Sequence, residues 1–400
     1  MHPVTSAAAF LAEVMTIPEL LGDEALRQTE FPVTRASVYL AHAGVCPLPR
    51  RVAEAVSAGA VAGTGGDQET AVPRDFLAGT RALGARLLSC TPAEVALVGP
   101  TSLGLSFVAA GLPFETGDEI LVYFDDYPSN VYPWLALEAR GVRVRRLESS
   151  VLGRLEVEDV LTQVTSQTRL VALASCHFIA GWRLDYARLG RELRARGVWF
   201  CLDAIQTLGA FPMDVTYVDF LAADAHKWLL GPCAAGLLYV RKALHEVLSP
   251  VVFGWHNVRC PDFVASAEMQ LRPDARRYEA GSANLLGTIG LRASLELMLE
   301  VGTDAIAREL LRKRDWIVPA LEAQGFDVLG AEAPADRASG ITSFYRPGRD
   351  MTAVHQRLEA AGVVTSLRKS RDGQNYIRIS PHFYNTDAEL ERLIAALARE

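Results

Sequence analysis

The chain has little that would mark a metal, nucleic-acid or membrane protein. Its six cysteines form no C-x-x-C pair and no short cluster with histidine, which argues against a structural zinc site. Lysine and arginine number 40 against 47 acidic residues, and this formal net charge of -7 gives no basic footprint for nucleic acid. No stretch reaches the roughly 18 apolar residues of a membrane helix. The start of the chain lacks the features of a signal peptide, so we expect a cytoplasmic protein with reduced thiols and no membrane association.

What the chain does have is enough apolar sequence for two packed regions. It contains 400 residues, of which 50% are hydrophobic. Apolar runs typical of strands lie at residues 94–98, 119–124, 142–147, 169–174, 198–202 and 217–223. Helical patterns separate most of these runs. Strands that alternate with helices predict an α/β fold with a mainly parallel sheet.

Two charged residues stand at the ends of such runs. Asp203 follows residues 198–202, and Lys227 follows residues 217–223. The carboxyl ends of strands in an open α/β sheet form the ligand crevice, so an acid and an amine there can reach one bound molecule. Pyridoxal phosphate fits, because its aldehyde forms a Schiff base with a lysine and its ring nitrogen is held protonated by a carboxylate. The apolar neighbours at residues 228–230 argue against a purely solvated lysine.

The same stretch resembles a known family. D-A-I-Q at residues 203–206 and A-H-K-W at residues 225–228 resemble the class V aminotransferases, a group of fold-type I pyridoxal phosphate enzymes. That group includes cysteine desulfurases, isopenicillin N epimerase and carbon-sulfur lyases. The resemblance implies a large domain, with a mainly parallel sheet sandwiched by helices, and a small C-terminal α/β domain. We expect an N-terminal segment at residues 1–37, the large domain at 38–285, a connecting helix at 286–302 and the small domain at 303–400.

The cofactor phosphate is expected at a helix start. Thr101 and Ser102 follow an apolar run and open a helix, where hydroxyls and backbone N–H groups suit a dianion. The relatives carry a similar turn, although here Pro100 lacks an N–H donor. The resemblance also places His226 against the phosphate. Asp224 stands where relatives often have serine and would repel a phosphate, so we expect it to point elsewhere or to bind a cation.

Other residues are assigned to the ring, to a partner subunit and to the substrate. By resemblance, Gln206 hydrogen bonds the phenolic oxygen of the cofactor and Tyr127 stacks on its ring. Ser282, in the segment Y-E-A-G-S-A-N, would reach the cofactor phosphate of a partner, which implies a homodimer with shared active sites. Arg378 would bind the α-carboxylate of an amino-acid substrate through two parallel hydrogen bonds. His177 lies just past an apolar run and is a further candidate for contact with the substrate.

The loop that carries a catalytic cysteine in the desulfurases of this family lacks one here. The chain has no cysteine after Cys260, and the corresponding segment at residues 365–375 carries Arg368, Lys369 and Arg371 instead. A persulfide-forming desulfurase is therefore not expected, unless Cys260 or Cys46 approaches from elsewhere. The basic segment would suit a substrate with a distal acid group.

The reaction itself stays open between three outcomes. In each, Lys227 removes the α-proton of the amino acid as a general base. We expect a lyase-type elimination or replacement at Cα and Cβ, because the motifs resemble the desulfurase and epimerase branch; aminotransferase and epimerase are the alternatives. A non-catalytic ligand-binding regulator is the least expected, since it would need a DNA-binding segment and the first forty residues are too few and too acidic to supply one. The presence of both Lys227 and Asp203 argues against an inactive scaffold.

Overall fold

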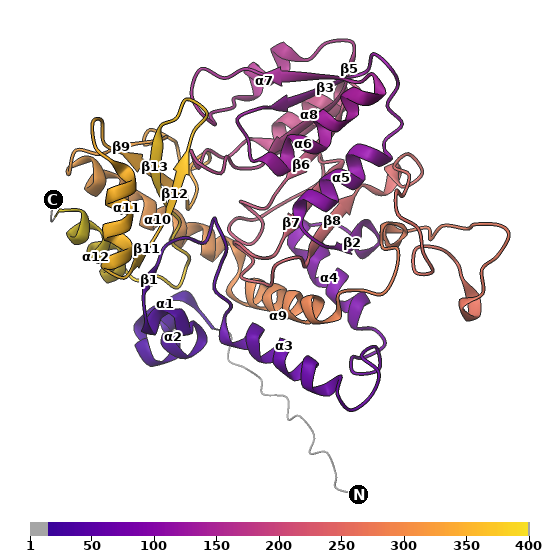
Figure 1. The fold of residues 1–400 in the computed structure, drawn as a ribbon, viewed down its shortest axis with the longest axis horizontal. Helices are drawn as coiled ribbons and strands as arrows, with labels where there is room; N and C mark the ends of the chain where they lie inside the picture. The colour runs from indigo at the N-terminus through magenta and orange to yellow at the C-terminus, as the bar shows by residue number, and fades with distance from the viewer. Residues whose placement is uncertain (1–14, 399–400) are drawn as a thin grey trace, which may run out of the picture.

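The computed structural model describes residues 15–398, which form a large unit and a small unit side by side (Figure 1). Within these residues the main sheet has the strand order β2-β8-β7-β6-β5-β3-β4. Its strands are β2 (Val95–Val98), β3 (Glu119–Tyr123), β4 (Arg143–Leu147), β5 (Thr168–Ala174), β6 (Trp199–Asp203), β7 (Phe220–Asp224) and β8 (Gly236–Val240). Strand β8 is antiparallel to both β7 and β2, whereas the other pairs are parallel. The prediction of an α/β fold with a mainly parallel sheet is confirmed.

Helices cover both faces of this sheet because its strands are apolar on both sides. In β5, Leu170 and Ala172 join one hydrophobic core, and Val171 and Leu173 join another. The first core also contains side chains of α5 (Thr101–Gly111) and α6 (Tyr132–Leu135), and the second contains side chains of α4 (Phe76–Leu88), α8 (Tyr186–Ala195) and α9 (Leu285–Val301). Two further helices of the large unit are α3 (Arg50–Ala62) and α7 (Val157–Gln163). Successive side chains of a strand point to opposite faces of the sheet. Because both faces are buried here, both sets of side chains are apolar, and each strand reads as a continuous apolar run.

The small unit follows α9 and holds the C-terminal part of the chain. Its elements are α10 (Thr303–Glu322), β9 (Asp327–Val328), β10 (Thr342–Tyr345), α11 (Met351–Ala360), β11 (Val363–Val364), β12 (Ser366–Lys369), β13 (Asn375–Ile379) and α12 (Asp387–Leu397). The four strands β12-β13-β10-β9 form an antiparallel sheet. The short strand β11 pairs instead, in parallel, with β1 (Val38–Tyr39). Sequence periodicity cannot predict such a pairing, because each strand is only two residues long.

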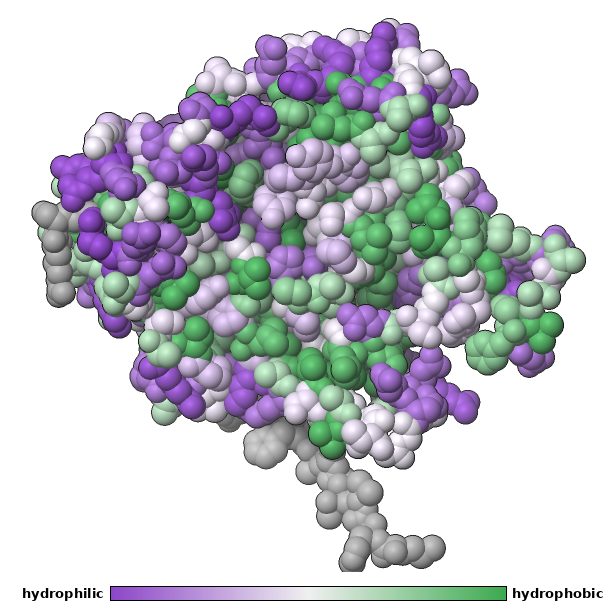
Figure 2. Space-filling view, viewed as in Figure 1, coloured by the Kyte–Doolittle hydropathy of each residue, from purple (hydrophilic) through white to green (hydrophobic). Residues whose placement is uncertain are grey.

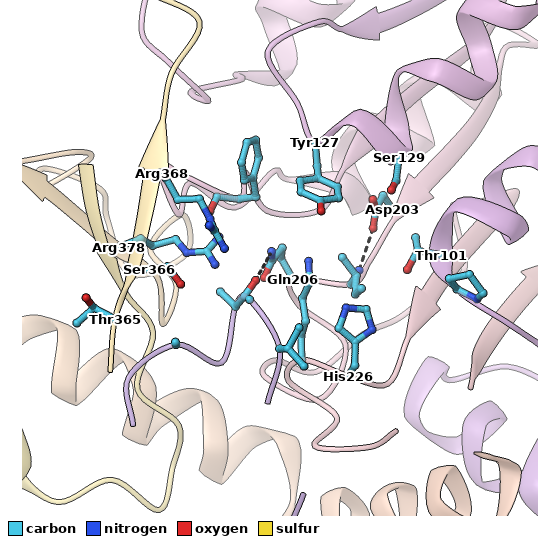
Figure 3. A pocket seen from close by; sticks show the side chains of 18 of the residues that line it. Thr101, Tyr127, Ser129, Asp203, Gln206, His226, Thr365, Ser366, Arg368 and Arg378 are labelled. Atoms are coloured by element: carbon cyan, nitrogen blue, oxygen red, sulfur yellow. Dashed lines mark hydrogen bonds between the residues drawn. The ribbon is translucent and has the colours of Figure 1, made fainter. Parts of the chain in front are cut away.

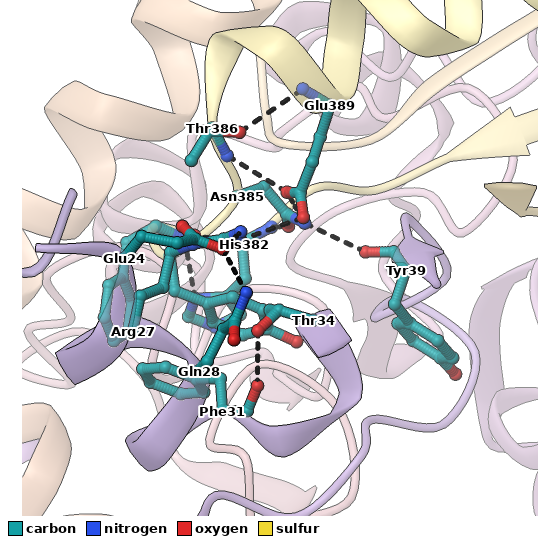
Figure 4. A network of polar contacts seen from close by, with 12 residues as sticks. Glu24, Arg27, Gln28, Phe31, Thr34, Tyr39, His382, Asn385, Thr386 and Glu389 are labelled. Atoms are coloured by element: carbon teal, nitrogen blue, oxygen red, sulfur yellow. Dashed lines mark hydrogen bonds and ion pairs between the residues drawn. The ribbon is translucent and has the colours of Figure 1, made fainter. Parts of the chain in front are cut away.

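A buried polar network fixes the N-terminal segment to the small unit (Figure 4). This segment begins with the helices α1 (Ile17–Gly22) and α2 (Glu24–Glu30). Arg27 of α2 is 4% exposed and forms an ion pair with Glu389 of α12 at 2.9 Å. Asn385 donates from Nδ2 to Glu389 at 2.9 Å and to the Tyr39 carbonyl at 3.2 Å. The strand that carries Tyr39 is thereby held in place before it reaches the site described below.

Breaking this network should destabilise the fold. We expect Arg27→Met to lower the free energy of unfolding by about 3 kcal/mol, because it leaves the carboxylate of Glu389 buried without its cation. Urea unfolding followed by circular dichroism measures the loss. Arg188→Met is the control, since Arg188 and Glu158 form an exposed pair whose loss should cost less than about 1 kcal/mol. Equal losses in the two variants would show that the buried pair contributes no more to the free energy of unfolding than the exposed pair does.

Among residues 15–398 we find no helix that combines the length and the apolar character needed to cross a membrane.

Candidate active site

A cavity of about 450 Å³ opens at the carboxyl ends of the parallel strands. It is bordered by the ends of β2, β6 and β7, by residues 39–45 of the N-terminal segment, and by β12 and β13 of the small unit (Figure 3). This volume is in the range of pockets that hold a cofactor or a small substrate. The predicted site residues that line it are Thr101, Ser102, Tyr127, Asp203, Gln206, His226, Lys227 and Arg378. The fold thus brings together residues that are far apart in the sequence.

Lys227 and Asp203 are both buried at the floor of the cavity, with exposures of 6% and 3%. Burial lowers the pKa of Lys227, which favours the neutral amine, although the carboxylate of Asp203 opposes the shift. Burial raises the pKa of Asp203, and the nearby carboxylate of Asp126 adds to the rise. A cationic ring nitrogen beside Asp203 would lower the pKa of Asp203 again and favour its ionised form. The Nζ atom of Lys227 lies 5.2 Å from the ring centroid of Tyr127, so the face of the tyrosine lies over the amine.

The first turn of α5 provides hydroxyls at one end of the cavity. The Thr101 hydroxyl accepts a hydrogen bond from the Asp224 backbone N–H at 2.9 Å, which leaves its own hydrogen free to donate. Ser102 and the ring of His226 line the same end. Pro100 precedes the helix as its N-cap residue and contributes no N–H. Hydroxyls, an imidazole and a helix start form a suitable site for a phosphate.

Asp224 points away from the cavity, which is one of the two alternatives that we expected. Its Oδ1 atom accepts from the N–H groups of Ala225 at 2.8 Å and Ala235 at 3.0 Å. Its Oδ2 atom accepts from Ala234 N–H at 3.0 Å and lies 2.8 Å from Nδ1 of His226. The other alternative, a bound cation, finds no support, because residues 15–398 contain no group of three metal-binding side chains. Asp224 therefore orients His226 and keeps its own carboxylate out of the cavity lining.

The amide of Gln206 is held in one orientation. Its Oε1 atom accepts from Nε1 of Trp228 at 3.0 Å, and its Nε2 atom donates to the Ala43 carbonyl at 3.2 Å. The side chain amide has two N–H groups, so one remains for a ligand in the cavity. This N–H group suits the hydrogen bond to the phenolic oxygen of the cofactor that we expected from Gln206.

Arg378 is buried in the wall of the cavity with part of its guanidinium unpaired. Its side chain is almost fully buried, and Nη1 donates to the Phe178 carbonyl at 2.7 Å. Nε and Nη2 are buried and have no hydrogen-bond partner among the described residues. Burial, together with the nearby cation Arg368, lowers the pKa of Arg378 to about 9. Because an unpaired buried cation is costly, this edge of the guanidinium is suited to a carboxylate.

Two predicted residues lie outside this cavity. His177 is buried against Asp125 and Ala180, with Nε2 3.0 Å from the Asp125 carbonyl and Nδ1 accepting from the Ala180 N–H at 3.0 Å. Both ring nitrogens are therefore used by the backbone, and the structure does not support contact between His177 and the substrate. Ser282 is exposed on the surface, where its hydroxyl lies 3.4 Å from Glu69. Its assigned role toward a partner subunit stays a prediction.

Other residues at the site were not singled out from the sequence, apart from Arg368 in its basic segment. Asp126 accepts from the Tyr127 N–H at 2.7 Å and from Nδ2 of Asn130 at 3.0 Å, which fixes the turn that presents Tyr127. Burial raises the pKa of Asp126 to about 6. Ser129 and Arg368 also line the cavity. Asp125 and Asp126 are adjacent after β3, and only the structure tells which of the two turns inward.

None of the chain's cysteines lines the cavity in the described structure. Cys46 lies closest in sequence to a lining segment, but its Sγ atom points to the Gly231 carbonyl at 3.6 Å. Burial raises the pKa of the Cys46 thiol to about 12, so the thiolate is disfavoured. Cys260 lies on the projecting segment after β8.

This set of groups fits pyridoxal phosphate. A buried amine and a buried carboxyl share the floor, hydroxyls and an imidazole form one end, and a tyrosine lies over the amine. The unpaired edge of Arg378 stands on the opposite side, where it can hold the carboxylate of a substrate. When bound, this cofactor supplies an aldehyde for an amine and a ring that withdraws electrons.

Comparisons with known proteins agree with this geometry. The family model for aminotransferase class-V matches residues 38–393. The chain is 28% identical to a probable cysteine desulfurase of Methanothermobacter thermautotrophicus, over 91% of this chain and 94% of that protein. It is 29% identical to an uncharacterized aminotransferase of Bacillus subtilis, over 78% of this chain and 81% of that protein.

Solved structures share the fold. A cysteine desulfurase from Thermococcus onnurineus superposes with a TM-score of 0.86 at 23% identity, covering 96% of this chain and 98% of that one. The cystine C-S lyase C-DES, solved with cysteine persulfide, gives a TM-score of 0.83 at 23% identity and covers 92% and 99% of the two chains. The family match extends over nearly the whole chain and includes every residue of the cavity described above. The chain therefore belongs to the class V aminotransferase family of pyridoxal phosphate-dependent enzymes.

Proposed function

We propose that the enzyme is a lyase that eliminates a substituent, such as a thiol, from Cβ of an amino acid. The observation that carries this proposal is the absence of cysteine from a cavity that holds Lys227, Asp203 and Arg378. A desulfurase that forms an enzyme persulfide needs a thiol within reach of the substrate sulfur. The name of one structural neighbour, a cystine C-S lyase, supports carbon-sulfur cleavage by this fold without deciding it.

The residues of the cavity would divide the work as follows. Arg378 holds the α-carboxylate through its free Nε and Nη2 edge and so fixes the α-carbon. Lys227, as a neutral amine, takes the α-proton on Nζ. Asp203 stabilises positive charge on the ring nitrogen of the cofactor. Tyr127 and residues 39–45 line the cavity beside these groups and would limit the access of water to a bound substrate.

The balanced reaction is R–S–CH2–CH(NH3+)–COO− plus water, giving R–SH, pyruvate and ammonium. The Cβ–S bond breaks and its electron pair leaves with the thiol, which is then protonated; no external oxidant or reductant is needed.

The products distinguish this reaction from desulfuration. We expect thiol, pyruvate and ammonia in equal amounts from an S-substituted cysteine, without any added keto acid. Enzyme-coupled assays for pyruvate and ammonia measure them. Formation of alanine, with a sulfur atom left on the enzyme, would instead show a desulfurase and overturn the proposal.

We further infer that the enzyme works as a homodimer. Ser282 lies on the surface, in the position for which family resemblance assigns contact with the partner's cofactor. A projecting segment at residues 251–269 carries exposed apolar side chains (Figures 1 and 2). Among them, Phe263, Val264 and Met269 are 75%, 68% and 60% exposed. Apolar exposure on this scale is typical of a surface that is covered by another protein, here a second copy of the chain.

A further inference from the structure

Two arginines stand side by side on one wall of the cavity. In the sheet of the small unit, Ser366 of β12 pairs with Arg378 of β13. Arg368 lies two residues beyond Ser366, so both arginines project from the same face as diagonal neighbours. Nη2 of each lies 3.5 Å from the point where a Cβ on Gly44 would stand. Figure 3 shows both side chains extending into the cavity from the side of the small unit.

One carboxylate would satisfy only the first of these arginines. With Nη1 bound to the Phe178 carbonyl, Arg378 has one complete bidentate edge left, Nε with Nη2, and that edge accepts both oxygens of a single carboxylate. Arg368 donates from Nη1 to the Leu367 carbonyl at 3.0 Å. Among the described residues, no carboxylate forms an ion pair with Arg368. Burial lowers the pKa of its guanidinium, which shows that its charge is partly removed from water. The second guanidinium is therefore without a counter-ion of its own.

The charges of the residues around the cavity also favour a second anionic group on the ligand. Two arginines line the cavity, Arg368 and Arg378, and the single lining carboxyl, that of Asp203, lies at the floor with Lys227, whose pKa is lowered by burial. The phosphate site at Thr101 and His226 lies across the cavity from the arginines (Figure 3), so a bound phosphate would not neutralise them. Two like charges at neighbouring positions of a sheet are unfavourable unless an anion lies between or beside them.

The neighbouring basic residues do not share this position. Lys369 is exposed and does not line the cavity. Arg371 forms an ion pair with Asp125 and donates from Nη2 to the Phe124 carbonyl at 2.7 Å, so it joins the small unit to the large one. Of the basic residues in the segment 365–375, Arg368 is the one placed to touch a ligand.

We propose that the substrate is an amino acid with a second acidic group on its side chain, which Arg368 binds while Arg378 binds the α-carboxylate. The proposal rests on the proposed function only in taking an amino acid as the substrate. It assigns Arg368 as a residue that determines specificity, because a neutral side chain on the substrate would leave the guanidinium of Arg368 unpaired in the cavity.

A binding experiment tests this without any turnover. The probes are succinate, glutarate and adipate, each compared with its monoamide, because none has an amino group that could react. Isothermal titration calorimetry on the holoenzyme measures their dissociation constants. We expect at least one diacid to bind about tenfold or more tightly than its monoamide, because a hydrogen bond between two charged groups is replaced by one to a neutral amide.

The variants locate the preference. Arg368→Gln should reduce the ratio between diacid and monoamide to less than about twofold, whereas Lys369→Gln, which removes a charge one residue away, should leave it unchanged. A preference retained in Arg368→Gln, or no preference in the wild type at any of the three lengths, would overturn the proposal. Failure of the lyase proposal would appear separately, as absent pyruvate with the diacid preference intact.

Discussion

Replacing Lys227 with alanine should abolish turnover. We expect the rate to fall by roughly 10⁴-fold or more, because the variant loses both the amine that binds the cofactor covalently and the base that takes the α-proton. The visible absorbance of the lysine-bound cofactor should disappear with it. Steady-state assays and the absorbance spectrum of the purified variant measure the two effects.

Lys242→Ala is the matched control for this experiment. Lys242 is exposed and lies outside the cavity, so its loss should change neither the rate nor the spectrum. A Lys227→Ala protein that kept the wild-type spectrum, or more than about a tenth of the activity, would remove the basis for the assigned role.

Replacing Asp203 with asparagine should lower kcat by about 10² to 10³-fold with little change in KM, because the variant loses the charge that stabilises the protonated ring nitrogen. The side chain keeps its size, and burial already disfavours the ionised form of Asp203. Folding should therefore be preserved, and a thermal unfolding curve beside the kinetic assay checks this.

Asp126→Asn separates this effect from the general loss of a buried charge. Asp126 is also buried near Lys227, but it acts through the N–H of Tyr127 and through Asn130. We expect its substitution to lower kcat less than about tenfold, since it touches no reacting atom. If the two variants lost activity equally, Asp203 would not have the special role that its position suggests.

The main sheet and the reactive pair could be predicted from the sequence for physical reasons. Strands buried on both faces leave continuous apolar runs, and a polar residue at the end of such a run is placed at the carboxyl edge of the sheet. Asp203 does end β6, and Lys227 follows β7 closely. Local patterns were sufficient here because each residue is positioned by its own strand.

The partners of the loop residues could not be predicted in this way, because they come from distant parts of the chain. The hydroxyl of Thr101 meets the backbone of Asp224, and Arg378 meets the carbonyl of Phe178. His177 also follows a strand, yet its ring turns to the backbone of Asp125 instead of the cavity. The direction in which a loop side chain points depends on tertiary packing. Hydrophobic periodicity does not predict this direction.

The neighbourhood of Arg368 shows the same limit. The sequence shows that residues 365–375 are basic, but it does not show that the three basic residues have different positions. Arg368 lines the cavity, Lys369 is exposed, and Arg371 forms an ion pair with the large unit. That division follows from the pairing of β12 with β13 and from the turn between them.

Proton NMR of the holoenzyme in deuterated buffer, with a panel of amino acids and with or without an added keto acid, tests the central claim most directly. A lyase that uses Lys227 as its base should consume its substrate without the keto acid, lose the β-substituent and form pyruvate. Turnover that requires the keto acid would show an aminotransferase, and deuteration at Cα without loss of the β-substituent would show an epimerase. Either result would contradict the proposed reaction.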